Sequence, residues 1–283
     1  MDFPISVPGI GLVGGKFVDE NQLTGTPGSL IPAQWGNGVT EEILNVISAA
    51  GLAPSEALNN QLLAAIRGLT AGRLINIRVF TASGTYTPTA GATSAIVELV
   101  GGGGGGGGAP ATSSAQVGIG AGGASGSYGK RRISSGLTTT TVTVGLGGTS
   151  GTGGTPGGTG GTSSFGALLS ATGGNGGNPA GPSAPPLNNG TNNTGASVIG
   201  ANIIGVVSQV PPIAFASSLN VGYSGAGAPG LLGAGAPLTN ISQAGNAAGN
   251  YGGGGSGALS LASASAANGG AGAPGIVIIY EYA

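Results

Sequence analysis

No charged side chain occurs between Ile133 and Tyr280, a stretch longer than half of this chain. Gly, Ala, Ser, Thr and Asn dominate it, and Gly alone accounts for 65 of the 283 residues of the chain. Glycine loses more backbone freedom on folding than any other residue, so ordering this stretch needs a large compensating stabilisation. Dense hydrogen bonding between backbones, or contact with a partner chain, can supply it.

The composition argues against a disordered chain, because disorder goes with low hydrophobicity and high net charge. Here 39% of the residues are apolar, the mean hydropathy is +0.30 and the net charge is −1. A folded surface made of backbone, hydroxyls and amides suits adhesion, self-association or a rigid scaffold better than catalysis.

The residue types that are absent exclude several functions. The chain contains no His and no Cys, which removes imidazole and thiol catalysis, disulfides and most transition-metal sites. Without a basic excess we expect no nucleic-acid partner. No apolar run is long enough for a membrane span and the N-terminus does not resemble a signal peptide, so we expect no membrane insertion. We therefore expect a non-enzymatic protein with no cofactor and no metal.

The composition changes near residues 70–80, which predicts an N-terminal region over 1–73 and a glycine-rich β domain over 74–283. Apolar spacing in the first region predicts two helices, Thr40–Ala50 with Thr40 as its N-cap and Ser55–Leu69 with Ser55 as its N-cap. Two such helices are too small to bury much by themselves, so we expect them to pack on another subunit or a neighbouring protein. The candidate attachment residues are Trp35, Ile43, Ile47, Leu62 and Ile66.

Short β-branched and alternating segments predict strands in the second region. They are Leu74–Phe80, Ser94–Val100, Thr138–Val144, Val198–Val210 and Ile276–Tyr282. We expect the last of these to be buried on both faces and to pair with Ser94–Val100, with Glu98 and Glu281 at solvated ends. Phe165 and Phe215 have apolar neighbours and are predicted to lie in the core.

Two arrangements are open for the glycine segments between these strands. Glycine backbones can pack as polyproline-II-like helices that hydrogen-bond laterally, or they can form loose loops over a β core. A repeat, Gly-Ala-Gly-Ala-Pro-Gly, occurs at 225–230 and 270–275. The predicted fold class is mainly β with Gly-rich loops, polyglycine-II-like packing being one open arrangement, and a small α-helical N-terminal attachment region.

Two groups of residues are candidates for recognition. Tyr128, Tyr223 and Tyr251 lie in Gly- and Ser-rich surroundings, where an exposed Tyr offers a large contact area at low entropic cost. Local packing under loops is the alternative for all three. Lys130, Arg131 and Arg132 gather cations that can contact phosphates or a partner subunit, and a solvated loop is the alternative for them.

Two parts of the chain resemble a known family. The N-terminal part contains Asp2-Phe3-Pro4-Ile5-Ser6-Val7-Pro8-Gly9, Gly25-Thr26-Pro27-Gly28-Ser29-Leu30-Ile31-Pro32-Ala33 and Trp35-Gly36-Asn37. The second part begins with Phe80-Thr81-Ala82-Ser83-Gly84-Thr85-Tyr86, runs into the Gly101–Gly108 run and ends with Gly275-Ile276-Val277-Ile278-Ile279-Tyr280-Glu281-Tyr282-Ala283. The first resembles the start of tail fibre proteins of phages and prophages of Gram-negative bacteria, and the second resembles the glycine-rich C-terminal domain of such fibres.

The resemblance implies a homotrimer in the virion tail, assembled in the cytoplasm of the bacterial host. The N-terminal region would attach to a phage tail or baseplate protein. The distal part would bind a host surface receptor, which could be lipopolysaccharide, capsule, a pilus or an outer-membrane protein. The chain is short for a fibre and has no long shaft, so it could also be the tip of a larger assembly.

Two other functions remain open. The first is a self-assembling or ice-binding glycine-rich protein, for which the Thr138–Thr141 run is the best feature. The second is a polysaccharide depolymerase, which would need two carboxylates close together; the glycine-rich half offers Glu98 and Glu281 for that role.

Overall fold

The structure, a computed structural model, describes residues 3–25, 27–70, 72–191 and 195–283. Asp2 and Thr26 of the motifs quoted above lie outside the described residues. The chain forms two compact units, Met1–Arg73, here called the N-terminal unit, and Leu74–Ala283, here called the C-terminal unit.

The first helix of the N-terminal unit, α1 (Ala33–Ala49), begins earlier than predicted. Its N-cap is Pro32, whose extended ψ of 139° turns the chain into the helix. Thr40, expected as the N-cap, lies inside the helix, where its hydroxyl donates to the carbonyl of Gly36 at 3.0 Å. The prediction failed because a hydroxyl residue can satisfy its donor within a helix as well as at its start.

The second helix, α2 (Gln61–Leu69), begins later than predicted, and the predicted start at Ser55 is wrong. The Gln61 side chain accepts from the Ser55 backbone N–H at 2.8 Å and donates to the Ala53 carbonyl at 2.7 Å. These two bonds hold the preceding segment in turns, so the helix forms only from Gln61 onward.

The N-terminal unit has a small interior. Its buried apolar side chains, among the residues described, are Ile10, Ile47 and Ala65. Phe17 packs between Phe3 and Trp35, with ring centroids 5.7 Å and 5.2 Å apart. Many large apolar side chains remain exposed, including Ile43, Leu44, Leu58, Leu62, Leu63, Ile66 and Leu69.

The C-terminal unit is mainly β, as predicted, and its strands form four antiparallel sheets. The first sheet has the order β1 (Leu74–Phe80), β16 (Ile276–Tyr282), β3 (Ser94–Val100), β5 (Tyr128–Ile133) and β12 (Ile204–Val206). The second has β11 (Val198–Ile199), β8 (Leu169–Ala171), β7 (Ser163–Phe165), β6 (Thr140–Thr143) and β2 (Gly84–Tyr86). The third has β10 (Leu187–Asn189), β13 (Ala214–Ser218) and β14 (Val221–Tyr223), and the fourth has β15 (Leu259–Ser260), β4 (Val117–Gly120) and β9 (Pro179–Ser183).

The predicted strands β1, β3 and β16 are confirmed with the expected bounds. β16 pairs with β3 along its whole length, from Ile276 opposite Val100 to Tyr282 opposite Ser94, as expected. The predicted strand Val198–Val210 is instead two short strands, because the chain bends between β11 and β12.

The first two sheets pack face to face over the main hydrophobic core. Alternate residues of β3, namely Ala95, Val97 and Leu99, point inward, and Phe165 is 1% exposed, which confirms it as a core residue. The Tyr86 and Phe165 rings meet edge to face at 5.3 Å. The N-terminal end of β1 and the C-terminal end of β16 are paired at Leu74 and Tyr282, so the chain enters and leaves this unit at the same end.

The glycine segments form packed helices rather than loose loops. Each backbone N–H from Gly101 to Gly108 donates to another segment, and the acceptors repeat every third residue. Gly101, Gly104 and Gly107 donate to the carbonyls of Ser127, Ala124 and Ala121, a second set donates to residues 155–161, and a third to residues 270–273. None of these eight glycines has a positive φ. A three-residue period without internal hydrogen bonds is the geometry of a polyproline-II-type helix.

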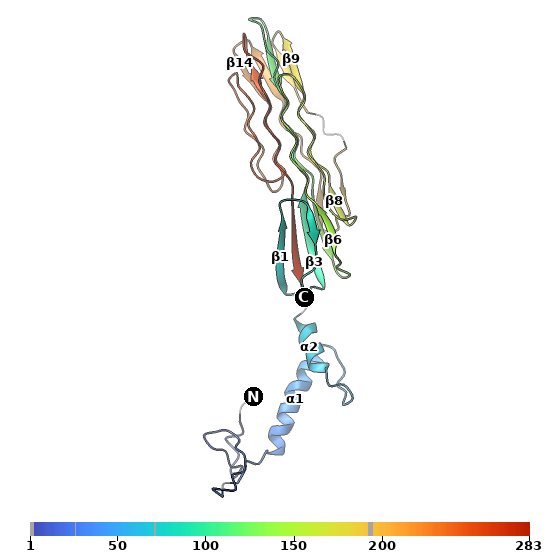
Figure 1. The fold of residues 1–283 in the computed structure, drawn as a ribbon, viewed down its shortest axis with the longest axis vertical. Coiled ribbons are helices and arrows are strands. Elements are labelled where there is room, and N and C mark those ends of the chain that lie inside the picture. Colours follow the sequence, from blue (N-terminus) through green and yellow to red (C-terminus); the bar gives the residue numbers. More distant parts are fainter. Residues whose placement is uncertain (1–2, 26, 71, 192–194) are drawn as a thin grey trace. The chain divides into compact units, whose positions relative to one another are not determined.

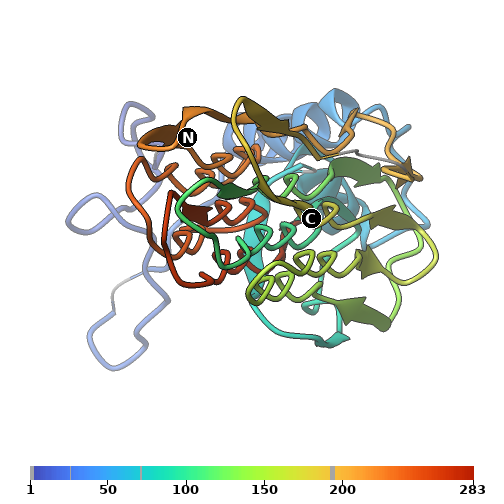
Figure 2. The ribbon, with the colours of Figure 1, turned by 90° about the horizontal axis from the view of Figure 1, so that it is seen from above.

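Further segments pack in the same way, and we call all of them glycine helices. They comprise residues 101–108, 121–127, 145–151, 155–161, 173–178, 225–228, 233–236, 245–248, 252–258 and 267–273. In Figure 1 they are the wavy traces that run lengthwise through the C-terminal unit, and Figure 2, seen from above, shows them as small coils side by side.

The 101–108 helix is enclosed by six neighbours. It donates to the 121–127, 155–161 and 267–273 helices, and it accepts from Gly148 and Gly151, Gly174 and Gly177, and Gly255 and Ala258. The neighbours are also bonded to one another, for example Gly157 to Gly177 and Gly269 to Gly151. This is hexagonal packing in which donating and accepting contacts alternate.

The 252–258 helix is enclosed in the same way. It donates to the 101–108, 225–228 and 245–248 helices and accepts from the 121–127, 267–273 and 233–236 helices. An enclosed helix has no face toward solvent and most of its positions have no room for a Cβ, which explains why the two enclosed segments carry the runs Gly101–Gly108 and Gly252–Gly255. Helices at the rim keep a free face, and there Thr149, Thr155 and Thr159 are exposed.

Candidate functional site

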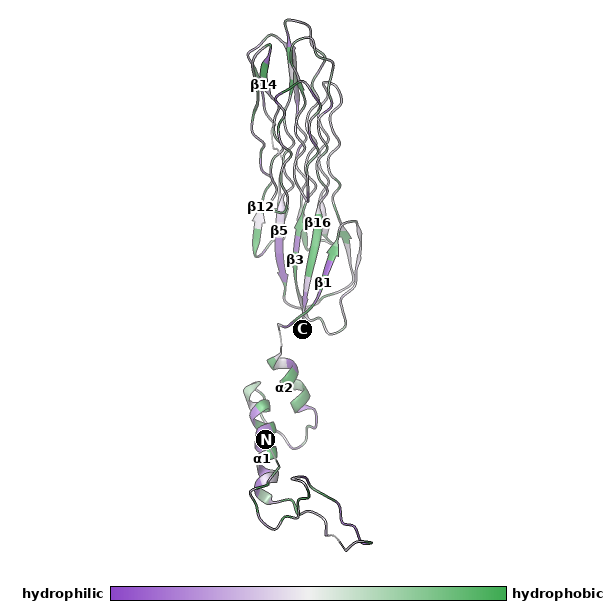
Figure 3. Cartoon of the chain, turned by 90° about the vertical axis from the view of Figure 1, so that its left-hand side faces the viewer, coloured by the Kyte–Doolittle hydropathy of each residue, from purple (hydrophilic) through white to green (hydrophobic). Residues whose placement is uncertain are grey.

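The charged residues of the C-terminal unit all lie on the first sheet. They are Arg78 on β1, Glu98 on β3, Lys130, Arg131 and Arg132 on β5, and Glu281 on β16. The glycine helices and the sheets beyond them carry none. In Figure 3 the first sheet shows purple and green strands, whereas the glycine helices are pale along their length.

The cation cluster lies in a strand and not in the solvated loop that we considered. Lys130 is 3.7 Å from Glu98, which stands opposite it in the β3–β5 register. Arg131 points to the other face, where it donates to the carbonyl of Gly200. Arg132 remains exposed, so it is the member of the cluster most accessible to a partner.

Tyr128 is only 4% exposed, so the expectation that it is an exposed recognition residue is wrong. Its hydroxyl donates to a Glu98 carboxylate oxygen at 2.6 Å. Burial and this hydrogen bond raise the pKa of Tyr128. Tyr251 is half-buried against the cluster formed by Val100, Tyr128 and Ile276, whereas Tyr223 is exposed on β14.

Glu281 is fully buried, so its predicted place at a solvated end is also wrong. Its carboxylate accepts from the Tyr86 hydroxyl at 2.8 Å, the Thr89 backbone N–H at 2.8 Å and the Thr89 hydroxyl at 2.6 Å. Burial by itself raises the pKa of Glu281, but the bonds from Thr89 and Tyr86 and the charge of Arg78 outweigh it and lower the pKa. Through these hydrogen bonds the buried Glu281 carboxylate links β16 to β2 and to the segment after it.

The carboxylates proposed for a depolymerase lie on opposite faces of the first sheet. Glu281 follows the inward residues Val277 and Ile279 and meets Tyr86 in the core. Glu98 alternates with the inward residues Val97 and Leu99, so it points outward, toward Lys130. Because a strand sends successive side chains to opposite faces, the two groups cannot flank one substrate bond.

The third sheet carries an exposed aromatic pair. Phe215 on β13 stands opposite Tyr223 on β14, and the two side chains are 45% and 47% exposed. Phe215 was predicted as core, which is wrong, because its neighbours Ala214 and Ala216 take the inward positions. The alternation of small and large residues in Ala214-Phe215-Ala216 is the sequence pattern that could have predicted the outward position of Phe215. In Figure 1 β14 lies at the end of the C-terminal unit away from β1 and the C-terminus.

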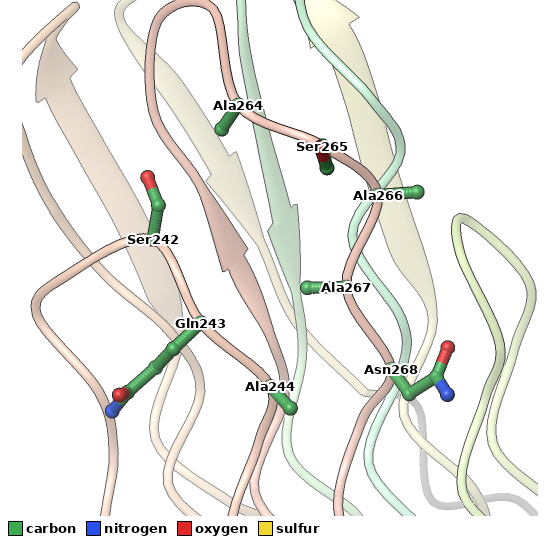
Figure 4. A pocket seen from close by; sticks show the side chains of 8 residues that line it. All are labelled: Ser242, Gln243, Ala244, Ala264, Ser265, Ala266, Ala267 and Asn268. Carbon is green, nitrogen blue, oxygen red and sulfur yellow. The ribbon is translucent and has the colours of Figure 1, made fainter.

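A groove lies between residues 242–244 and 264–268, and Figure 4 shows its lining. It is lined by Ser242, Gln243, Ala244, Ala264, Ser265, Ala266, Ala267 and Asn268. The Gln243 side chain points away from the opposite segment, and its amide donates to the Thr239 hydroxyl at 2.6 Å. Its walls are four alanines and four neutral polar side chains with no charged group among them, and the Gln243 amide is already bonded to Thr239, so we assign no ligand to this groove.

The attachment candidates of the N-terminal unit have different surroundings. Ile47 is buried, whereas Ile43, Leu62 and Ile66 are exposed. Trp35 lies in α1 and its ring packs edge-on against Phe17. The exposed members are therefore available for contact with another chain, and Ile47 stabilises the unit itself.

Neither a membrane span nor a metal-binding group is found in the described ranges. None of their helices is long and apolar enough to cross a bilayer. Nor do these residues contain a cluster of three or more Asp, Glu, His or Cys that could hold a metal ion.

A family model described as a glycine-rich domain matches residues 80–282, which is most of the C-terminal unit. No curated protein matches the chain.

Proposed function

We propose that this chain, which belongs to the glycine-rich domain family, is a non-enzymatic receptor-binding protein of a bacteriophage tail fibre. It would attach the virion to the surface of a Gram-negative host. The observation that carries the proposal is a bundle of hydrogen-bonded glycine helices. The end of this bundle away from the first sheet has no charged residues and bears exposed aromatic side chains.

The bundle supports this role because it positions loops without a large side-chain core. Its hydrogen bonds join backbones, so the loops at its far end can change in sequence while the scaffold stays the same. Host recognition by phages selects for such variation. The resemblance of both ends of the chain to phage tail fibres also supports a receptor-binding role.

The N-terminal unit supports attachment and assembly. It leaves apolar side chains of both helices exposed, including Ile43, Leu62 and Ile66. Large exposed apolar patches mark interaction sites. We propose that they contact two further copies of this chain in a homotrimer and a phage tail or baseplate protein. The protein would then be a virion tail component assembled in the cytoplasm of the host.

The test is whether the purified protein binds Gram-negative cells and blocks adsorption of the phage that encodes it. We expect saturable binding to susceptible strains and loss of adsorption at saturation. A protein that binds no strain and leaves adsorption unchanged would rule out the proposed function.

A second candidate is an ice-binding or self-assembling protein. The Thr138–Thr141 run does not support it, because Thr140 and Thr141 belong to β6 and no residue of the run lies in a glycine helix. Another observation does: Thr149 and Thr159 are exposed on the neighbouring 145–151 and 155–161 helices at the rim of the bundle. Thermal hysteresis of the purified protein would favour this candidate, and its absence would exclude ice binding.

A further inference from the structure

The outer face of the third sheet is built around the aromatic pair. Ala214, Ala216 and Gly222 occupy its inner face, where the two alanines pack with Val117, Ile119 and Leu259 in a buried cluster. Phe215 and Tyr223 therefore point outward, directly opposite each other. Directly opposed aromatic side chains on one sheet face have closely spaced Cβ atoms and form one contact surface.

Neighbouring residues extend this surface. Ile213 and Val221 each precede one of the aromatic residues by two positions, and they are 70% and 51% exposed. Asn188 on β10 stands opposite Phe215 on the other side and is exposed. We call the surface formed by Asn188, Ile213, Phe215, Val221 and Tyr223 the tip face.

The tip face contains large apolar groups and no ionic ones. It lies in the stretch without charged residues from Ile133 to Tyr280, and the charges of the C-terminal unit lie on the first sheet. A phosphate or an acidic sugar bound here would lose water without gaining a counter-charge, which is costly. Two exposed aliphatic side chains beside two aromatic ones instead match the apolar centre of a protein interface, in which aromatic residues contribute most of the affinity.

We propose that the tip face binds an uncharged loop of a host surface protein through apolar side chains of that loop. The inference rests on the proposed function and names the partner class and the residues for it. The amide of Asn188 would sit at the rim and pair with backbone groups of the loop.

The experiment compares wild-type protein with the double variant Phe215→Ser, Tyr223→Ser in binding to intact cells of strains that the wild type binds. Loss of two central aromatic anchors is expected to weaken binding by about a hundredfold or more. Leu146→Ser is the matched control, because Leu146 is 78% exposed on a glycine helix of the same unit, so this variant is expected to bind as the wild type does. Thermal melting should show all three proteins folded, since these side chains point to solvent.

Pre-treatment of the cells identifies the partner class. Proteinase K treatment is expected to abolish wild-type binding, and periodate oxidation of surface sugars to leave it unchanged. Loss of wild-type binding after periodate and retention of binding after proteinase K would overturn the inference in favour of a glycan.

Unchanged binding of the double variant would also overturn the inference while leaving the proposed function standing. A change in the light-scattering mass of the double variant would assign the tip face to subunit contact instead, and wild-type binding to no strain would remove the proposed function itself.

Discussion

At the residue scale, the enclosed positions must be glycine because there is no room for a Cβ atom. A Cβ at Gly105 would overlap the carbonyl of Thr149, and one at Gly104 would overlap the carbonyl of Asn175. These neighbours are backbone atoms of other glycine helices, so they cannot move aside as a flexible side chain could. The conformation itself is not the constraint, since both glycines have ordinary negative φ.

We predict that Gly105→Ala destabilises the C-terminal unit by about 3 kcal/mol or more, at the upper end of the range for overpacking substitutions. Gly249→Ala is the matched control, because a Cβ there meets nothing within 4 Å. Denaturant unfolding followed by circular dichroism measures both. Equal stability of the two variants would contradict hexagonal packing around the 101–108 helix.

Glu281 gives the second prediction at this scale. Its folded pKa lies below the unfolded value of about 4.3, so the unfolded chain takes up the proton first as the pH falls. The stabilisation by Glu281 is therefore present above about pH 5 and is lost as the pH drops through the folded pKa. Replacing the buried carboxylate by an amide should cost about 1.5–3 kcal/mol at pH 7 through its hydrogen bonds.

Melting of Glu281→Gln and wild type between pH 7 and pH 3 provides the measurement. The gap between their melting temperatures should narrow as the pH falls below about 4, since only the wild type loses a charged acceptor. A gap that stays constant over this range would show that the charge of Glu281 does not stabilise the fold.

At the element scale, the glycine helices should be the slowest part of the chain to exchange. All backbone N–H groups from Gly101 to Gly108 are bonded inside the bundle. Hydrogen exchange by mass spectrometry should show them protected to the level of global unfolding, whereas peptides around Gly136 and Gly249 exchange early. Rapid exchange over 101–108 would mean that these segments are loose loops.

The elements that could be predicted from the sequence are those with side-chain periodicity. β1, β3 and β16 carry β-branched runs, and their bounds and the β3–β16 pairing were predicted correctly. The glycine helices have no side-chain pattern to read, so the sequence left their packing open between two arrangements. α1 and α2 were misplaced because Thr40 and Ser55 resemble N-caps, while Pro32 and the Gln61 side chain determine the starts.

The candidate site was less predictable than the fold. Tyr128 looks exposed among Gly and Ser in sequence, but those glycine segments are packed around it and it is buried. Phe215 was assigned to the core from apolar neighbours, although strand alternation turns it outward. Which side chains remain free depends on contacts between segments far apart in the chain.

At the scale of the whole molecule, the proposed trimer depends on the exposed apolar faces of α1 and α2. We expect light scattering to give about three times the chain mass of 26.2 kDa. The double substitution Leu62→Glu, Ile66→Glu puts charge on the apolar face of α2 and should return the protein to a monomer. The melting of the C-terminal unit should stay unchanged, because it has its own core. A wild-type monomer would contradict the trimer.

The central claim is that recognition occurs at an uncharged end of a rigid bundle, and its most direct test is the salt dependence of cell binding by the wild-type protein. Contacts without charges are not screened by salt, whereas binding through Lys130, Arg131 or Arg132 would weaken steeply as ionic strength rises. The account predicts that the apparent Kd on susceptible cells changes less than about twofold between roughly 0.05 and 0.5 M NaCl. A loss of affinity of about tenfold or more over that range would contradict it and would move the binding site to the charged first sheet.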